Sequence, residues 1–141
     1  MHGSRPAAIP QEDRTLAVLA HLLQIFTGFL GPLIIAVLKR QTPFVLFHSL
    51  QVILWQVAYM VVSILVIVVF VVSILAGAAQ QSHGQGAPMW LVVAIPGIVV
   101  LSIGGWMLTI VLAIVYAMRA ADGKWAEYPL VGRWARRLAN G

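Results

Sequence analysis

Residues 55–75 read WQVAYMVVSILVIVVFVVSIL, a stretch without a single charged side chain. As a helix, a stretch of this length rises about 30 Å, the thickness of the hydrocarbon core of a bilayer. Its valine and isoleucine content would favour a strand in water, but a lone strand in lipid leaves its backbone groups unsatisfied. This stretch therefore decides the fold class, because it predicts a helix that crosses a membrane.

Two further apolar segments flank this one. Over the whole of residues 15–118 the only charged side chains are Lys39 and Arg40. No water-soluble domain of this size has enough interior to hide so much hydrocarbon. We therefore expect an all-α integral membrane protein, a three-helix transmembrane bundle. The predicted divisions are a disordered or polar tail (1–14), a transmembrane domain (15–121, with spans at about 15–38, 52–75 and 91–118) and a basic cytoplasmic tail (122–141).

The composition excludes several classes of function. The chain of 141 residues is 61% hydrophobic and 9% charged, whereas a soluble domain is about half apolar and about a quarter charged. The net charge of +5 does not indicate nucleic-acid binding, since most of the basic residues lie beside the last apolar segment, where cations meet anionic lipid headgroups. The absence of cysteine excludes disulfides, thiolate metal sites and cysteine nucleophiles.

The first apolar segment contains Gly28, Gly31 and Pro32 near its middle, and these predict a kink in the helix. With three spans, seven of the nine basic residues lie on the side of the 39–43 loop and the C-terminus. The positive-inside rule makes that side cytoplasmic and leaves the N-terminus outside.

A re-entrant hairpin in the first segment is the alternative. It would place all nine basic residues on one side. Charge alone prefers it, but each arm would cross only half of the membrane and the turn would need burial by other helices. We favour three spans.

Polar residues recur on one face of the first segment. His21, Gln24, Gly28 and Gly31 follow each other at three- and four-residue steps. A polar side chain in a membrane normally faces the interior of the bundle, because an unpaired polar group in hydrocarbon costs several kcal/mol. A proton or substrate path through His21 is one interpretation. A hydrogen bond from His21 or Gln24 to a neighbouring helix is the commoner one, and we favour it.

His48 and Gln51 share a helix face at the start of the second segment, because they lie three residues apart. They can pair with the polar residues of the first segment or with the C-terminal segment. An interfacial cap without further function is the interpretation that we favour.

Small residues form a stripe along the third segment. Gly105, Thr109, Ala113 and Ala117 are each four residues apart, so they lie on one helix face. Small side chains let another backbone approach closely, and the stripe predicts a helix–helix interface, either internal or between protomers. With Gly28 and Gly31 these are the candidate helix-packing residues.

The C-terminal tail predicts a short amphipathic helix that lies on the membrane interface. Its two faces differ in chemistry, one being apolar and the other basic. A docking site for a soluble partner is the alternative interpretation. The apolar face carries Leu130, Val131, Trp134 and Leu138, and the candidate lipid-headgroup residues are Arg133, Arg136 and Arg137 together with Lys39 and Arg40.

Nothing in the sequence matches a catalytic motif. There is no His-Glu-x-x-His, no Gly-x-Ser-x-Gly, no P-loop and no dinucleotide-binding glycine pattern. The four acidic residues are divided between the two ends of the chain, so no pair of carboxylates is evident. We therefore expect no enzymatic activity, no cofactor and no metal site.

Two local patterns resemble one known family. They are residues 31–51, with GPLII, KR and PFVLFHSLQ, and residues 117–132, AMRAADGKWAEYPLVG. Over about residues 15–135 the chain resembles the bacterial Tic-twenty-like family. These are small membrane proteins with a domain of unknown function, distantly similar to a membrane subunit of the chloroplast inner-envelope import translocon.

The resemblance implies a compact helical bundle in a prokaryotic inner membrane, with the Phe-His-x-x-Gln turn and the Tyr-Pro element on one side. It adds Tyr128 to His21, Gln24, His48 and Gln51 as candidates for polar packing or partner contact. Leu46 stands where related sequences often have a charged residue, and the chain lacks an additional segment of the plant relative. Protein-conducting activity is therefore not transferred.

The sequence thus predicts a non-enzymatic, multi-pass protein of the bacterial inner membrane. We expect a helical bundle or accessory subunit that associates with itself or with larger membrane machinery. An oligomeric small channel or carrier is the alternative, since three helices rarely enclose a path alone. The expected partners are anionic lipids at the basic tail and a homo-oligomer or larger membrane complex, without nucleic acid.

Overall fold

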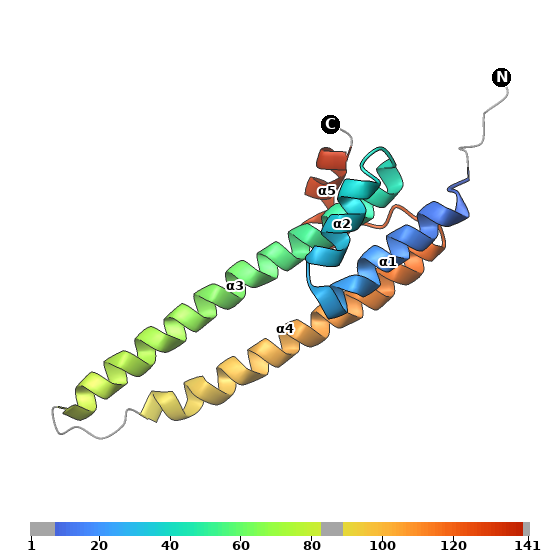
Figure 1. Ribbon diagram of the computed structural model, residues 1–141. Coiled ribbons are helices and arrows are strands. Elements are labelled where there is room, and N and C mark those ends of the chain that lie inside the picture. The colour runs from blue at the N-terminus through green and yellow to red at the C-terminus, as the bar shows by residue number, and fades with distance from the viewer. Residues whose placement is uncertain (1–7, 83–88, 140–141) are drawn as a thin grey trace. The chain divides into compact units, whose positions relative to one another are not determined.

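The computed structural model describes residues 8–82 and 89–139, and its regular elements there are all helices (Figure 1). The chain divides into two compact units. Unit 1 comprises Met1–Val57 with Thr109–Gly141, and unit 2 comprises Ala58–Leu108. The five helices are α1 (Gln11–Thr27), α2 (Leu30–Leu38), α3 (Pro43–Ser82), α4 (Met89–Ala121) and α5 (Gly132–Ala139).

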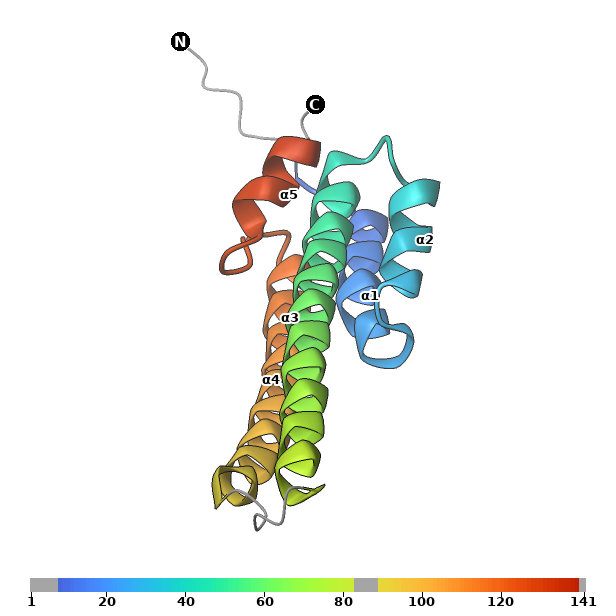
Figure 2. The same cartoon turned by 90° about the vertical axis from the view of Figure 1, so that its left-hand side faces the viewer.

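The first apolar segment forms two helices instead of the single kinked helix that we expected. Gly28 ends α1 with a φ of +60°, a conformation that glycine adopts at little steric cost, and its N–H still donates to the Gln24 carbonyl at 3.1 Å. Pro32 lies in the first turn of α2, where its missing N–H would have no helical partner in any case. The chain therefore turns back, and α1 and α2 lie side by side within unit 1 (Figure 2).

Gly31 allows this turn to close tightly. A Cβ atom added there would lie 2.5 Å from Thr27 Oγ1 and 2.8 Å from Leu23 Cβ. The Gly31 N–H donates to that same Thr27 hydroxyl at 3.0 Å. Any side chain at this position would therefore push α2 away from the end of α1.

The three-span prediction is not confirmed. Within the described residues two helical segments are long and apolar enough to cross a membrane, Pro43–Gln80 and Val92–Ala121. The first segment contains the whole predicted span 52–75. The second contains the predicted span 91–118 except for residue 91. Helix α2 has nine residues and so rises only about 14 Å, less than half of a hydrocarbon core.

The predicted N-terminal tail also ends earlier than expected. Helix α1 begins at Gln11, so the last four residues of the predicted tail 1–14 are helical. Residues 1–7 of that prediction lie outside the described part of the chain.

Unit 1 is built on small buried side chains. Ala17 contacts Phe44 and Ala120 in one cluster, and Ala20 contacts Ile35 and Val45 in another. Small residues allow helix backbones to approach closely, which matters in lipid, where no hydrophobic force draws helices together. Of the predicted helix-packing stripe, Thr109, Ala113 and Ala117 are buried in this unit.

Unit 2 consists of the adjoining parts of α3 and α4, and most of its large apolar side chains are exposed. Gly105, the first member of the small-residue stripe, lies here against Tyr59. A Cβ at Gly105 would lie 2.9 Å from Tyr59 Cε2. The Tyr59 hydroxyl donates to the Ser102 carbonyl at 3.4 Å, a long hydrogen bond.

Candidate functional site

A buried polar network lies in unit 1, built around a strap of extended chain. We call residues 124–128, which follow the end of α4, the strap. Helix α4 ends at Ala121, and Gly123 turns the chain with a φ of +72°. The chain thus leaves α4 at Asp122 and Gly123 and enters the strap.

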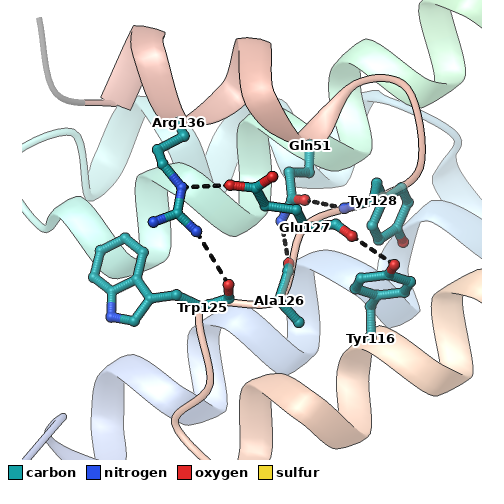
Figure 3. A network of polar contacts seen from close by, with 7 residues as sticks. All are labelled: Gln51, Tyr116, Trp125, Ala126, Glu127, Tyr128 and Arg136. Atoms are coloured by element: carbon teal, nitrogen blue, oxygen red, sulfur yellow. Dashed lines mark hydrogen bonds and ion pairs between the residues drawn. The ribbon is translucent and has the colours of Figure 1, made fainter.

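Gln51 on α3 holds the strap through its side-chain amide (Figure 3). Its Nε2 donates to the Ala126 carbonyl at 3.1 Å, and its Oε1 accepts the N–H of Tyr128. One amide therefore pairs with an acceptor and a donor of the backbone, as a neighbouring strand would. Gln51 is fully buried, so both backbone groups depend on it for a partner.

Two more side chains bind strap carbonyls. His48 Nε2 lies 3.2 Å from the Lys124 carbonyl. The Tyr116 hydroxyl donates to the Glu127 carbonyl at 2.6 Å, as Figure 3 shows. The strap backbone is therefore bound by side chains of α3 and α4 at several successive residues. This is how an extended segment without a neighbouring strand satisfies its backbone inside the fold.

The remaining polar side chains form a chain of hydrogen bonds whose direction can be deduced. A carbonyl only accepts, so His48 Nε2 carries the proton toward Lys124 O, and the Nδ1 of a neutral His48 must accept. His21 Nε2 then donates to His48 Nδ1 at 2.9 Å, and His21 Nδ1 accepts from the Tyr128 hydroxyl at 2.9 Å. Gln24 Nε2 completes the chain by donating to the Tyr128 oxygen at 3.1 Å.

In the neutral form that burial favours, both histidines carry their proton on Nε2. A charged His48 would place an ionised group in a fully buried position, at a cost far above that of a neutral one. Burial also raises the pKa of the Tyr128 hydroxyl above its ordinary value, so Tyr128 keeps the proton that it donates to His21.

All five candidate contact residues lie together in this network, with at most 3% of each exposed. Their contacts are made within the chain, so none offers its polar atoms to an outside partner. The chain of donors ends on a backbone carbonyl, which cannot pass a proton onward. The arrangement can therefore lock α1, α3 and the strap together, and Gln24 also accepts a long hydrogen bond of 3.5 Å from Gln56.

Sequence reasoning missed the aromatic part of the site. Tyr116 is buried in unit 1, and its ring centroid lies 4.3 Å from that of Tyr128. Trp125 contacts the rings of Phe44 and Phe47, each with centroids 5.2 Å apart. In the sequence, Tyr116 is one more aromatic residue of a predicted apolar span. Its hydroxyl group, which needs a hydrogen-bond partner when buried, is the signal that could have identified it.

The candidate headgroup residues fall into two groups. Lys39 forms an ion pair of 2.6 Å with Glu12 and lowers the pKa of that carboxyl by hydrogen bonding to it. Arg136 forms an ion pair of 2.6 Å with Glu127 and lies over the Phe47 ring, so it binds the fold itself. Arg40, Arg133 and Arg137 are exposed.

Residues 8–82 and 89–139 bring together no group of three or more histidine, cysteine, aspartate or glutamate side chains that could hold a metal ion. A surface cavity of about 360 Å³ lies among Glu127, Arg133, Arg136 and Arg137.

Residues 12–135, which include all of the network, match the MamF/MmsF family, the magnetosome magnetite crystal formation proteins. The chain belongs to this family. Searches of curated proteins and of solved structures find no match. This is a family of magnetosome membrane proteins involved in magnetite crystal formation, and the two long apolar helices agree with a membrane localisation.

The assignment to the Tic-twenty-like family is therefore wrong. The motifs that suggested it contain His48, Gln51 and Tyr128, which hold the strap in place. Such residues report how a fold is held together, and a fold does not specify a function.

Proposed function

We propose that this member of the MamF/MmsF family is a non-enzymatic subunit of the magnetosome membrane. It acts as a helical bundle that associates with itself or with larger membrane machinery during magnetite crystal formation. The buried network of unit 1 carries this proposal. Its polar side chains bind one another and the strap backbone, which suits a rigid module and leaves them no free groups for chemistry on a substrate.

The outer surface of the α1–α2 hairpin supports association. Phe26 is 84% exposed, and on α2 Ile34 is 59% and Leu38 75% exposed. Apolar surface that is continuous and exposed marks contact with a membrane or another protein. Because α2 is too short to cross a bilayer, we propose that this hairpin enters the membrane from one side and is covered there by a second copy or by a larger partner.

This hairpin also changes the proposed topology. With two crossings, the N-terminus, the loop after α2 and the C-terminus lie on one side, which carries all nine basic residues, while residues 81–91 carry none. The positive-inside rule makes the basic side cytoplasmic. Single cysteines at positions 11 and 40 of this cysteine-free chain test the arrangement. Labelling of both from the same side supports it, and labelling from opposite sides restores the three-span topology.

Photocrosslinking in native magnetosome membranes tests the association. The photoreactive group is placed at Ile34, and a matched control carries it at Val45, which is buried in the same unit. We expect position 34 to capture one defined protein, either a second copy or a larger subunit, and position 45 to capture none. Capture of lipid alone at position 34 would overturn the proposal.

Two functional assays complete the test. In a magnetosome-forming bacterium that lacks its own family member, this chain should restore magnetite crystal size, measured by electron microscopy. Purified protein in liposomes should conduct ions no faster than protein-free liposomes. Flux that is lost in His21→Leu would instead establish the channel or carrier alternative.

A further inference from the structure

Helix α5 presents three different faces, and one of them is apolar and uncovered. Gly132 and Ala135 are buried and attach the helix to unit 1. Leu130 just before the helix is 85% exposed, and Trp134 and Leu138 at four-residue intervals are 68% and 59% exposed. Trp134 and Leu138 lie one helical turn apart on α5, and together with the exposed Leu130 just before the helix they make up what we call the apolar stripe.

The backbone holds Leu130 outward at a cost. Leu130 has a φ of +70°, and the N–H of Val131 donates to the Pro129 carbonyl at 2.9 Å across it. This is the γ-turn of the strained kind, in a region of φ that non-glycine residues rarely adopt. A glycine would relieve the strain, yet a leucine is present and contributes almost nothing to the core. The leucine therefore keeps an exposed apolar side chain at a position where glycine would be less strained.

The arginines of α5 divide between the protein and the surroundings. Arg136 is bound to Glu127 and donates to the Trp125 carbonyl at 3.3 Å (Figure 3), which fixes the rotation of the helix. Arg133 and Arg137 are exposed and lie one helical turn apart, next to the apolar stripe. The uncovered side of α5 thus combines an apolar stripe with a row of positive charge.

We propose that this side of α5 binds the anionic lipid surface of the membrane in which α4 is embedded. The stripe enters the interface, Trp134 takes the headgroup level that tryptophan prefers, and Arg133 and Arg137 pair with lipid phosphates. Three observations favour lipid over a protein partner. The charge is complementary to anionic headgroups, the preceding apolar helix ends at Ala121, and one eight-residue helix offers far less area than a stable protein interface needs.

This surface goes beyond the proposed function, since it can exist whatever the protein does for the crystal. The test uses the full chain with Leu138→Cys carrying a spin label, reconstituted in vesicles of phosphatidylcholine with or without phosphatidylglycerol. Collision of the label with oxygen reports burial in lipid, and collision with a nickel chelate reports exposure to water. The matched pair of variants is Arg133→Gln/Arg137→Gln against the charge-preserving Arg133→Lys/Arg137→Lys.

We expect the label to be lipid-buried in the vesicles with phosphatidylglycerol. Loss of the two charges should lower the ratio of docked to undocked label roughly 30-fold, whereas the lysine pair should stay near wild type. Leu130→Gly/Trp134→Ser should also release the label, and unchanged circular dichroism shows that these variants are folded. A label that is equally water-exposed in both lipids overturns the proposal. A burial that depends on protein density and not on lipid charge overturns it too, in favour of a second copy.

Discussion

Units 1 and 2 are both helical and apolar, but they are held together by different interactions. Unit 1 joins α1, α3 and the strap through buried histidine, glutamine and tyrosine side chains. In unit 2, Tyr59 packs on Gly105 and its hydroxyl donates a long hydrogen bond to the Ser102 carbonyl. Apolar composition brings helices into lipid but does not choose their neighbours. The comparison teaches that buried polar side chains select the neighbours of the helices in unit 1.

The largest expected effect on stability follows from replacing Gln51. A small effect would contradict the difference between the two units. Gln51→Leu leaves the Ala126 carbonyl and the Tyr128 N–H buried without partners, so the free energy of unfolding should fall by about 3 kcal/mol. Equilibrium unfolding by SDS in mixed micelles measures this. The matched control is Gln80→Leu, an exposed position at the end of α3, where we expect a change below about 0.5 kcal/mol. Equal effects at the two positions would contradict the account.

The second prediction concerns the hydrogen-bond chain. His48→Leu and Tyr128→Phe should each destabilise the protein by about 2 kcal/mol, because each leaves a buried His21 nitrogen unpaired. The double variant should lose less than the sum of the two, since both act on the same histidine. Unfolding of the wild type, the two single variants and the double variant gives the coupling free energy between His48 and Tyr128. Strict additivity would mean that the network is not continuous.

The third prediction sharpens the comparison with a pair of glycines. Gly31→Ala should lower the free energy of unfolding by about 2 kcal/mol, because the new methyl group meets Thr27 and Leu23. Gly97→Ala in unit 2 meets nothing within 4 Å and should stabilise its helix by up to about 1 kcal/mol. Thermal unfolding in detergent compares them, and a stabilising Gly31→Ala would show that the hairpin is loosely packed.

The smallest expected effect lies within unit 2, at two adjacent glycines. Gly104→Ala has open space around it, whereas the new methyl of Gly105→Ala would meet the Tyr59 ring. We expect Gly105→Ala to be less stable than Gly104→Ala by about 1 kcal/mol, measured by the same unfolding assay. No difference would mean that the contact of Gly105 with Tyr59 has no energetic weight.

The sequence predicted the all-helical class, the two long apolar segments and the polar residues worth following. It could not decide between a kink and a break in the first segment, because Gly28, Gly31 and Pro32 suit both. The positive φ of Gly28 decides it, and that angle follows from how α2 packs on α1.

The hydrogen-bond partners of the polar residues could not be predicted from the sequence, for a different reason. Gln51 binds backbone atoms of the strap, and backbone groups leave no signature in residue identity. His21 and His48 could be recognised as polar residues in apolar segments, but their contact with each other depends on the course of the chain between them. The family was misassigned because the recognised motifs serve the fold.

The central claim is that His21 and His48 are linked head to tail in one directed chain of hydrogen bonds. Long-range ¹H–¹⁵N correlation of protein with ¹⁵N-labelled histidine tests it directly, with His2 and His83 replaced by glutamine so that two rings remain. The account predicts that both rings are neutral and protonated on Nε2, with protons that exchange slowly with water. A charged ring, or a proton on Nδ1 of either histidine, would contradict it.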